Sequence, residues 1–129
     1  ENLLLKSTRS DSSILLCDFG CAKYLPKDGG GLWTKCGTPA YTAPEMLLGR
    51  VYKTEIDMWS IGCILFMLLG GYQPFEGEDE FELHESIISC DFHFDDDEDA
   101  RSAWEVVSPE AKHVICQLYC NPTSKRSFH

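Results

Sequence analysis

The stretch TEIDMWSIGCILFMLL, residues 54–69, decides the fold. Thr54 is a residue type that caps helices, and Glu55 and Asp57 suit a first helical turn, where backbone dipoles favour negative charge. The residues that follow are nearly all apolar, and a helix that is apolar on most of its sides is buried in a core. The stretch therefore predicts a long central helix. Its apolar run is too short to cross a bilayer, so we expect a soluble protein.

Two further helices are predicted downstream of the central one. Residues 78–89 have an apolar side, made of Phe81, His84, Ile87 and Ile88. A second helix opens at Ser108 and Pro109, with Ser as the cap and Pro in the first turn, and runs to about Tyr119.

Upstream of residue 54 the pattern changes to short apolar runs and loops. Residues 3–5 and 14–17 predict two short strands joined by a turn around residues 10–12. Pro26 and three consecutive glycines predict a flexible loop over residues 26–31. Pro44 starts a short helix that Gly49 ends. The expected class is mainly α with a small strand pair at the start.

Charge narrows the range of partners. The 129 residues carry a net charge of −10, which argues against nucleic acid or an anionic membrane as the main partner. The acidic run at residues 95–99 has the oxygen ligands of a calcium site, but it lacks the glycine and the alternating spacing of a calcium loop. A solvated, self-repelling loop is the favoured interpretation.

The seven cysteines do not indicate a secreted disulfide framework, because their number is odd and their spacing irregular. Several lie inside apolar runs, where a free cysteine behaves as a small hydrophobic residue. We therefore expect reduced thiols, in a cytoplasmic protein or a nuclear one.

The first chemical signal is Asp18-Phe19-Gly20, directly after the second predicted strand. A carboxylate at a strand end is well placed to hold Mg²⁺ that bridges nucleotide phosphates. The tripeptide alone is weak, since an Asp-x-Gly turn arises by chance in many loops.

Residues 1–5, Glu-Asn-Leu-Leu-Leu, resemble the end of the protein kinase motif H-R-D-L-x-x-x-N. Asn2 matches the metal-binding Asn of that motif. A strand–turn–strand between Asn2 and Asp18 lets both side-chain oxygens face one site.

Residues 37–45, Gly-Thr-Pro-Ala-Tyr-Thr-Ala-Pro-Glu, match the end of a kinase activation segment almost throughout. This signal is strong, because it follows Asp-Phe-Gly in the expected order. Residues 57–62 resemble the kinase motif D-x-W-S-x-G, in which Asp57 would anchor the catalytic loop. Arg126 matches the arginine that pairs with the glutamate of Ala-Pro-Glu, here Glu45.

The resemblance covers nearly the whole chain, residues 1–129, as a partial protein kinase domain. It implies the C-terminal lobe of the protein-kinase-like fold, truncated at both ends. Thr38 favours the serine/threonine type. Residues 104–108 are similar to the calcium/calmodulin-dependent group, whereas residues 32–36 are similar to the cyclic-nucleotide-dependent kinases.

The resemblance also implies a site. ATP and Mg²⁺ would be the cofactors, with Asn2 and Asp18 as metal ligands, and Thr38 would orient the catalytic loop. Thr34 matches an activating phosphothreonine, placed there by an upstream kinase, and Lys23 matches a contact of its phosphate. An exposed, unmodified loop threonine is the alternative.

Protein substrates would meet a pocket lined by Lys35, Pro39 and Thr42. The lysine suggests tolerance for a polar or acidic residue after the phosphoacceptor. Glu1 matches a carboxylate that meets a basic residue before the phosphoacceptor, although Met67 stands where strongly arginine-directed relatives have Glu.

A Gly-rich loop, a strand lysine and the catalytic Asp, which would precede residue 1, are not in this sequence. The resemblance therefore implies a fragment of an active serine/threonine kinase that is inactive in isolation. The alternative is a fragment of a pseudokinase that acts as a binding scaffold. Calmodulin is a possible partner of the parent, but no binding segment for it is encoded here.

Overall fold

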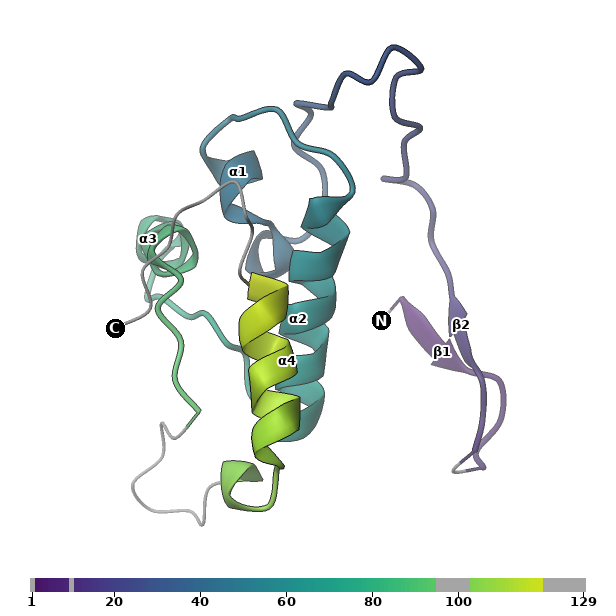
Figure 1. Cartoon of the computed structure of the whole chain (residues 1–129), viewed down its shortest axis with the longest axis vertical. Coiled ribbons are helices and arrows are strands. Elements are labelled where there is room, and N and C mark those ends of the chain that lie inside the picture. Colours follow the sequence, from purple (N-terminus) through teal and green to yellow (C-terminus); the bar gives the residue numbers. More distant parts are fainter. Residues whose placement is uncertain (1, 10, 95–102, 120–129) are drawn as a thin grey trace.

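The computed structural model describes residues 2–9, 11–94 and 103–119 of the chain. It is mainly helical, with one antiparallel strand pair at the start, as the sequence predicts (Figure 1). The elements in chain order are β1 (Leu3–Leu5), β2 (Ile14–Leu16), the 3₁₀ turn η1 (Pro39–Tyr41), α1 (Pro44–Leu47), α2 (Glu55–Gly70), α3 (Glu80–Ser89), the 3₁₀ turn η2 (Ala103–Glu105) and α4 (Pro109–Tyr119). None of the helices in the described ranges is long and apolar enough to cross a membrane.

The strand pair forms a hairpin in which Leu3 lies opposite Leu16 and Leu5 lies opposite Ile14. The connecting turn is tied by an ion pair of 3.1 Å between Arg9 Nε and Asp11 Oδ1. The hairpin stands beside the helices in Figure 1, and the side chains of both strands are exposed.

The central helix α2 packs against α4, which runs along it in Figure 1. It ends at Gly71, which has a left-handed φ of 85° and donates its N–H to the carbonyl of Met67. The predicted cap at its start is wrong: Thr54 itself has helical backbone angles, and its side chain makes no capping hydrogen bond.

Aromatic rings fill the core between α2 and its neighbours. The Phe66 ring, which is fully buried, lies 4.7 Å from that of Trp104, and the Trp59 ring lies 4.8 Å from that of Tyr119. Phe75 stacks on Trp59 at 5.2 Å. Such ring pairs add to the free energy gained from burial alone.

Two polar groups share this core with the rings. Burial raises the pKa of the Cys63 thiol to about 12, and burial, followed by the neighbouring Cys63, raises the pKa of the Tyr119 hydroxyl. Both groups therefore stay neutral at physiological pH.

The prediction that α2 is buried on most sides is wrong for one of its sides. Met58, Ile61 and Leu68 are 49%, 48% and 70% exposed. Among the described elements, α4, η1 and η2 are those with repeated contacts to α2. They cover one side of the helix, and its other apolar side faces solvent.

Helix α3 begins two residues later than predicted, at Glu80, because Asp79 is the cap. Its Oδ1 accepts a hydrogen bond of 2.9 Å from the N–H of Glu82. Ile87 is buried as expected, whereas Phe81 and Ile88 are exposed, at 68% and 37%.

The remaining helical predictions are confirmed. Ser108 Oγ accepts from the N–H of Ala111 at 3.2 Å, with Pro109 at the first position of α4. Pro44 begins α1, and Gly49 follows with a left-handed φ of 64°. The acidic run at residues 95–99 lies outside the described residues.

Candidate functional site

Asp18 lies two residues beyond the end of β2 and has an unusual backbone conformation. Its φ is 62°, in the left-handed region that residues other than glycine rarely adopt. One carboxylate oxygen accepts a hydrogen bond of 3.0 Å from the N–H of Gly20, and the side chain is exposed. Left-handed angles outside glycine occur often at functional sites, because the surrounding structure must hold them in place.

Because β1 and β2 pair antiparallel, the hairpin brings Asn2, just before β1, close to Asp18, which follows β2. The Asn2 carbonyl accepts a hydrogen bond of 3.0 Å from the N–H of Cys17, the neighbour of Asp18. The two predicted metal ligands thus lie at the same end of the strand pair. No cluster of three or more His, Cys, Asp or Glu side chains suited to a metal ion occurs in the described ranges.

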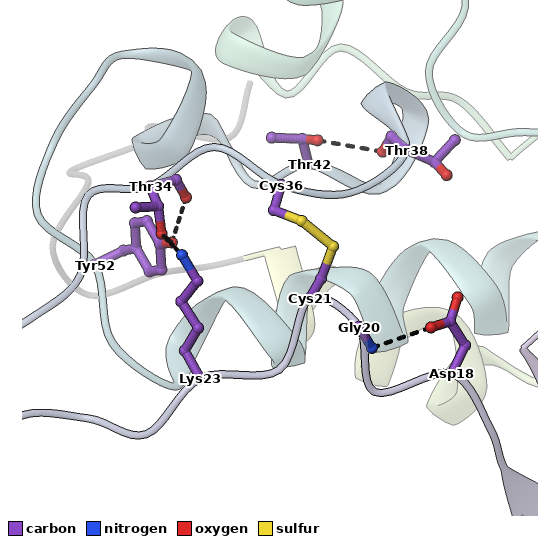
Figure 2. The surroundings of a disulfide bond; sticks show 9 residues. All are labelled: Asp18, Gly20, Cys21, Lys23, Thr34, Cys36, Thr38, Thr42 and Tyr52. Carbon is purple, nitrogen blue, oxygen red and sulfur yellow. Dashed lines mark hydrogen bonds between the residues drawn. A yellow bond between two sulfur atoms is a disulfide. The ribbon is translucent and has the colours of Figure 1, made fainter.

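The segment that follows Asp18-Phe19-Gly20 is closed by a disulfide between Cys21 and Cys36, shown in Figure 2. The expectation that the cysteines are reduced is therefore wrong for this pair. Cys63, by contrast, is a buried thiol outside any disulfide. The sequence expectation failed because it judged cysteines by apolar surroundings, whereas Cys21 and Cys36 lie on an exposed loop.

Thr34 and Lys23, predicted as phosphosite and phosphate contact, lie together inside this loop. Lys23 Nζ donates a hydrogen bond of 2.7 Å to Thr34 Oγ1 (Figure 2). The hydroxyl of Tyr52 lies 3.2 Å from the same Oγ1 and also donates to the Thr34 carbonyl. The ring of Tyr52 is buried, at 7% exposure, so this partner of Thr34 is fixed in the structure.

The loop has further anchors on the segment before α2. Leu32 and Tyr52 exchange two backbone hydrogen bonds of 2.8 Å, and Lys53 Nζ donates to the Gly29 carbonyl at 2.8 Å. A Cβ on Gly31 would lie 2.6 Å from the Tyr52 carbonyl oxygen, so the close approach of these backbones requires glycine. Sequence reasoning predicted a loop here, but not its contact with residues 51–53.

Of the three described residues of the predicted substrate pocket, Pro39 and Thr42 contact each other, whereas Lys35 contacts the end of α1. Thr42 Oγ1 donates to the Thr38 carbonyl at 3.2 Å, and its N–H bonds the Pro39 carbonyl at 3.0 Å. Lys35 Nζ reaches the Leu47 carbonyl at 3.3 Å. The Thr38 side chain itself is exposed and makes no capping bond to η1.

The predicted structural residues are Glu45, Asp57 and Arg126, of which the first two lie in the described part of the chain. The Glu45 carbonyl accepts from the N–H of Arg50 at 2.8 Å, and Glu45 makes further contacts. Asp57 is exposed in the first turn of α2. Glu1 and Arg126 lie outside the described residues, so the ion pair with Glu45 and the carboxylate at residue 1 stay predictions.

Residues 1–128 match the family model described as "Protein kinase domain", so the chain belongs to the protein kinase domain family. It is mainly helical, as the C-terminal part of that fold requires.

Relatives place the chain near calcium/calmodulin-dependent kinases. It is 42% identical over 126 residues to calcium/calmodulin-dependent protein kinase type 1 of Macrobrachium nipponense, across 98% of this chain and 34% of the relative. The enzyme of the same name from Caenorhabditis elegans is 41% identical over 120 residues, across 93% and 32%. Myosin light chain kinase A of Dictyostelium discoideum is 40% identical over 126 residues, across 98% and 41%. The chain thus spans roughly a third of the length of these relatives.

Proposed function

We propose that this chain is part of a serine/threonine protein kinase that transfers the γ-phosphate of ATP to protein hydroxyl groups. The observation that carries the proposal is the placement of Asp18. It lies in a left-handed conformation at a strand end, beside Asn2 and at the start of the activation segment. A carboxylate held this way serves metal-assisted phosphoryl transfer, which depends on positioning and charge.

Asp18 and Asn2 are the residues that would hold Mg²⁺, with nucleotide phosphates as its further ligands. Both offer oxygen, the donor type that Mg²⁺ prefers, and the Asp18 carboxylate is exposed to receive it. When bound, the metal neutralises charge that develops on the transferred phosphoryl group. The Gly20 N–H, bonded to Asp18 Oδ1 at 3.0 Å, orients the carboxylate.

Thr34 is proposed as the phosphorylated switch, modified by an upstream activating kinase. Lys23 Nζ already contacts its hydroxyl at 2.7 Å, so a phosphate on Thr34 would gain a charged partner at once. Thr38 is proposed to orient the catalytic loop. Asp57 is proposed to anchor that loop, and Arg126 to pair with Glu45.

Lys35, Pro39 and Thr42, together with Glu1, are proposed to receive the protein substrate. Lys35 is exposed, and its ammonium group donates a hydrogen bond to the carbonyl of Leu47, the last residue of α1. This position favours a polar or acidic residue after the phosphoacceptor. A peptide array with the longer protein tests this, because a preference for bulky apolar residues would contradict it.

The same proposal makes residues 1–129 a partial kinase domain that is inactive in isolation, because the catalytic base and the ATP-binding lobe would come from residues before Glu1. The retained Asp18 and Asn2 favour an active parent over a pseudokinase scaffold, since a scaffold has no need of metal ligands. The parent protein would be located in the cytoplasm or the nucleus. Calmodulin is proposed as a partner of the longer protein, because two relatives are named calcium/calmodulin-dependent protein kinase.

The test uses a longer protein that extends upstream through the ATP-binding lobe, with ATP and Mg²⁺ and a protein substrate. Asp18→Asn removes the carboxylate charge at nearly constant shape. We expect phosphate transfer to fall by about a hundredfold or more, in line with the loss of one electrostatic stabiliser. Asp11→Asn is the matched control, because Asp11 is an exposed carboxylate in the hairpin turn that pairs with Arg9. Equal activity of the two variants would contradict the proposal.

A further inference from the structure

The disulfide and the Lys23–Thr34 contact share one register across the activation loop. Cys21 and Cys36 are separated by 15 residues, and Lys23 and Thr34 by 11. Lys23 therefore lies two residues after Cys21, and Thr34 two residues before Cys36, so the lysine–threonine pair is nested inside the cysteine pair. Figure 2 shows the two segments side by side, with the lysine side chain extended to the threonine. A bond between the outer residues therefore fixes the alignment of the inner ones.

Other contacts hold the two halves of the loop unequally. The half that carries Thr34 is tied to the segment before α2 through Tyr52. The segment around Lys23 is joined to the segment around Thr34 by the disulfide and by the hydrogen bond of the lysine itself. Loss of the disulfide would therefore leave Thr34 in place and release Lys23, since closing such a loop without a covalent link has an entropy cost.

We propose that Cys21 and Cys36 form a reversible redox clasp that holds Lys23 on the Thr34 hydroxyl, so that oxidation masks this hydroxyl and reduction exposes it. Both cysteines are exposed, which gives small oxidants and protein dithiols access to their sulfur atoms. The regulatory meaning of the clasp rests on the proposed function, in which Thr34 is the phosphorylated switch.

The redox chemistry is complete with a peroxide as oxidant and a dithiol as reductant. One thiolate attacks hydrogen peroxide and becomes a sulfenic acid, and the second thiol displaces its oxygen as water. Two thiols and one peroxide thus give one disulfide and two waters. In the reverse direction a dithiol of the thioredoxin class attacks the disulfide through a mixed disulfide. It is itself oxidised, and two protons return to Cys21 and Cys36.

The masking acts on the oxygen that would receive phosphate. Lys23 Nζ donates to Thr34 Oγ1 over 2.7 Å, and the Thr34 hydroxyl donates to Tyr52 Oη over 3.2 Å, because the Tyr52 hydrogen is used on the Thr34 carbonyl. While the clasp is closed, a lone pair and the hydrogen of this hydroxyl are therefore both engaged. Opening the clasp frees the lysine to solvent, where its amine is also free to react. This gives two independent readouts, the reactivity of the Lys23 amine and the phosphorylation of the Thr34 hydroxyl.

The first arm measures acylation of lysines in the longer protein by a water-soluble succinimidyl ester, read by peptide mass spectrometry. Lys27, exposed in the same loop, is the internal reference. We expect reduction to raise the Lys23 rate about fivefold relative to Lys27, which is about 1 kcal/mol, the usual net value of one hydrogen bond. Cys21→Ser and Cys36→Ser should show the fast rate without reductant, and Cys116→Ser should respond to redox state like the wild type. If the ratio of the Lys23 to the Lys27 acylation rate changes neither with reductant nor with serine substitution, the clasp is overturned.

The second arm measures phosphate at Thr34 after treatment with an active protein kinase that modifies activation-segment threonines. We expect the reduced protein and Cys21→Ser to be modified about fivefold faster than the oxidised wild type, for the same hydrogen bond. Equal rates overturn the masking role. If Thr34 takes no phosphate in either state while Lys23 still responds to reduction, the clasp stands and the switch in the proposed function fails.

Discussion

Trp104 donates its indole Nε1–H to the hydroxyl oxygen of Tyr72 over 2.9 Å at the edge of the aromatic core. The same hydroxyl donates to the His93 carbonyl over 3.1 Å. One oxygen thereby ties η2, the turn after α2 and the segment after α3 to each other. Trp104 is 1% exposed, so water does not readily replace the bond to its indole.

Removing this hydroxyl should lower stability more than its small size suggests. Tyr72→Phe keeps the ring, which lies 5.2 Å from Phe66, and deletes both hydrogen bonds. We expect the free energy of unfolding to fall by about 1–3 kcal/mol, measured by urea denaturation. Tyr24→Phe is the matched control, because Tyr24 is fully exposed and its change should stay within about 0.5 kcal/mol. Equal shifts in the two variants would contradict the assignment.

Gly62 in α2 should resist the usual gain from replacing a helical glycine by alanine. Alanine is the better helix former by about 1 kcal/mol. A Cβ at Gly62, however, would lie 2.8 Å from Tyr119 Cε1 and 3.1 Å from Leu118 Cβ, where α4 crosses α2. We therefore expect Gly62→Ala to destabilise by about 1–3 kcal/mol, as overpacked cores do.

Leu68→Ala controls for the effect of alanine in the same helix, because Leu68 is 70% exposed and its loss leaves no cavity. Thermal unfolding of both variants compares them directly. A higher midpoint for Gly62→Ala than for the wild type would show that the two helices tolerate the extra methyl group.

Asp79 should act as the start signal of α3. Its Oδ1 accepts from the Glu82 N–H at 2.9 Å, and Glu82 Oε2 accepts from the Glu78 N–H at 2.9 Å, so two backbone donors depend on this turn. Asp79→Ala should cost about 1 kcal/mol, and Asp79→Ser, which keeps an acceptor, clearly less. Amide hydrogen exchange over residues 80–84 measures the fraying, and equal protection in both variants would rule out the cap.

Local rules were sufficient to predict the elements that contain their own signals. Ser108 and Pro109 start α4, and Gly49 follows α1, because cap chemistry is decided within one turn. Thr54 shows the limit of the same rules. It has the right residue type, but its backbone is already helical, so its hydroxyl is not directed at the free N–H groups of the first turn.

Burial was predicted less well, because it depends on which layers cover an element. The continuous apolar pattern of α2 indicates burial all round, yet the described neighbours cover one side and leave Met58, Ile61 and Leu68 exposed. Phe81 shows the same effect on α3 at 68% exposure. A sequence gives the apolar surface of a helix, and packing partners decide how much of it is buried.

In the candidate site, sequence placed the residues but missed what joins them. Resemblance predicted Lys23 as a contact of a phosphate on Thr34. In the structure Lys23 Nζ lies 2.7 Å from the Thr34 hydroxyl, and the phosphorylated contact stays a prediction. The disulfide and Tyr52 were missed, since both depend on pairing between residues far apart in the chain. The sequence does have a cysteine at each end of the activation loop. Judging cysteines by their apolar surroundings did not identify these two as a disulfide pair.

The buried Cys63 thiol predicts a loss of stability in alkali. Burial raises the pKa of Cys63 from 9.0 to about 12, so between these values the unfolded chain loses a proton that the folded chain keeps. Stability is therefore unaffected by this group below pH 9 and falls as pH rises above it, by up to about 1.4 kcal/mol per pH unit. Tyr119, whose pKa burial also raises, adds a second loss above its ordinary value of 10.0.

Cys63→Ala separates these two contributions. The variant should be less stable near neutral pH by about 1–2 kcal/mol, because it leaves a small cavity. This difference in stability should then shrink between pH 9 and pH 10. Over that range the wild type loses stability because its unfolded chain releases the Cys63 proton, and the variant has no such thiol. Ile115→Val is the control, a fully buried residue that does not titrate and whose deficit should stay constant over that range. Urea denaturation at half-unit steps of pH measures both differences, and parallel curves for the two variants would mean that the Cys63 thiol is not held neutral by burial.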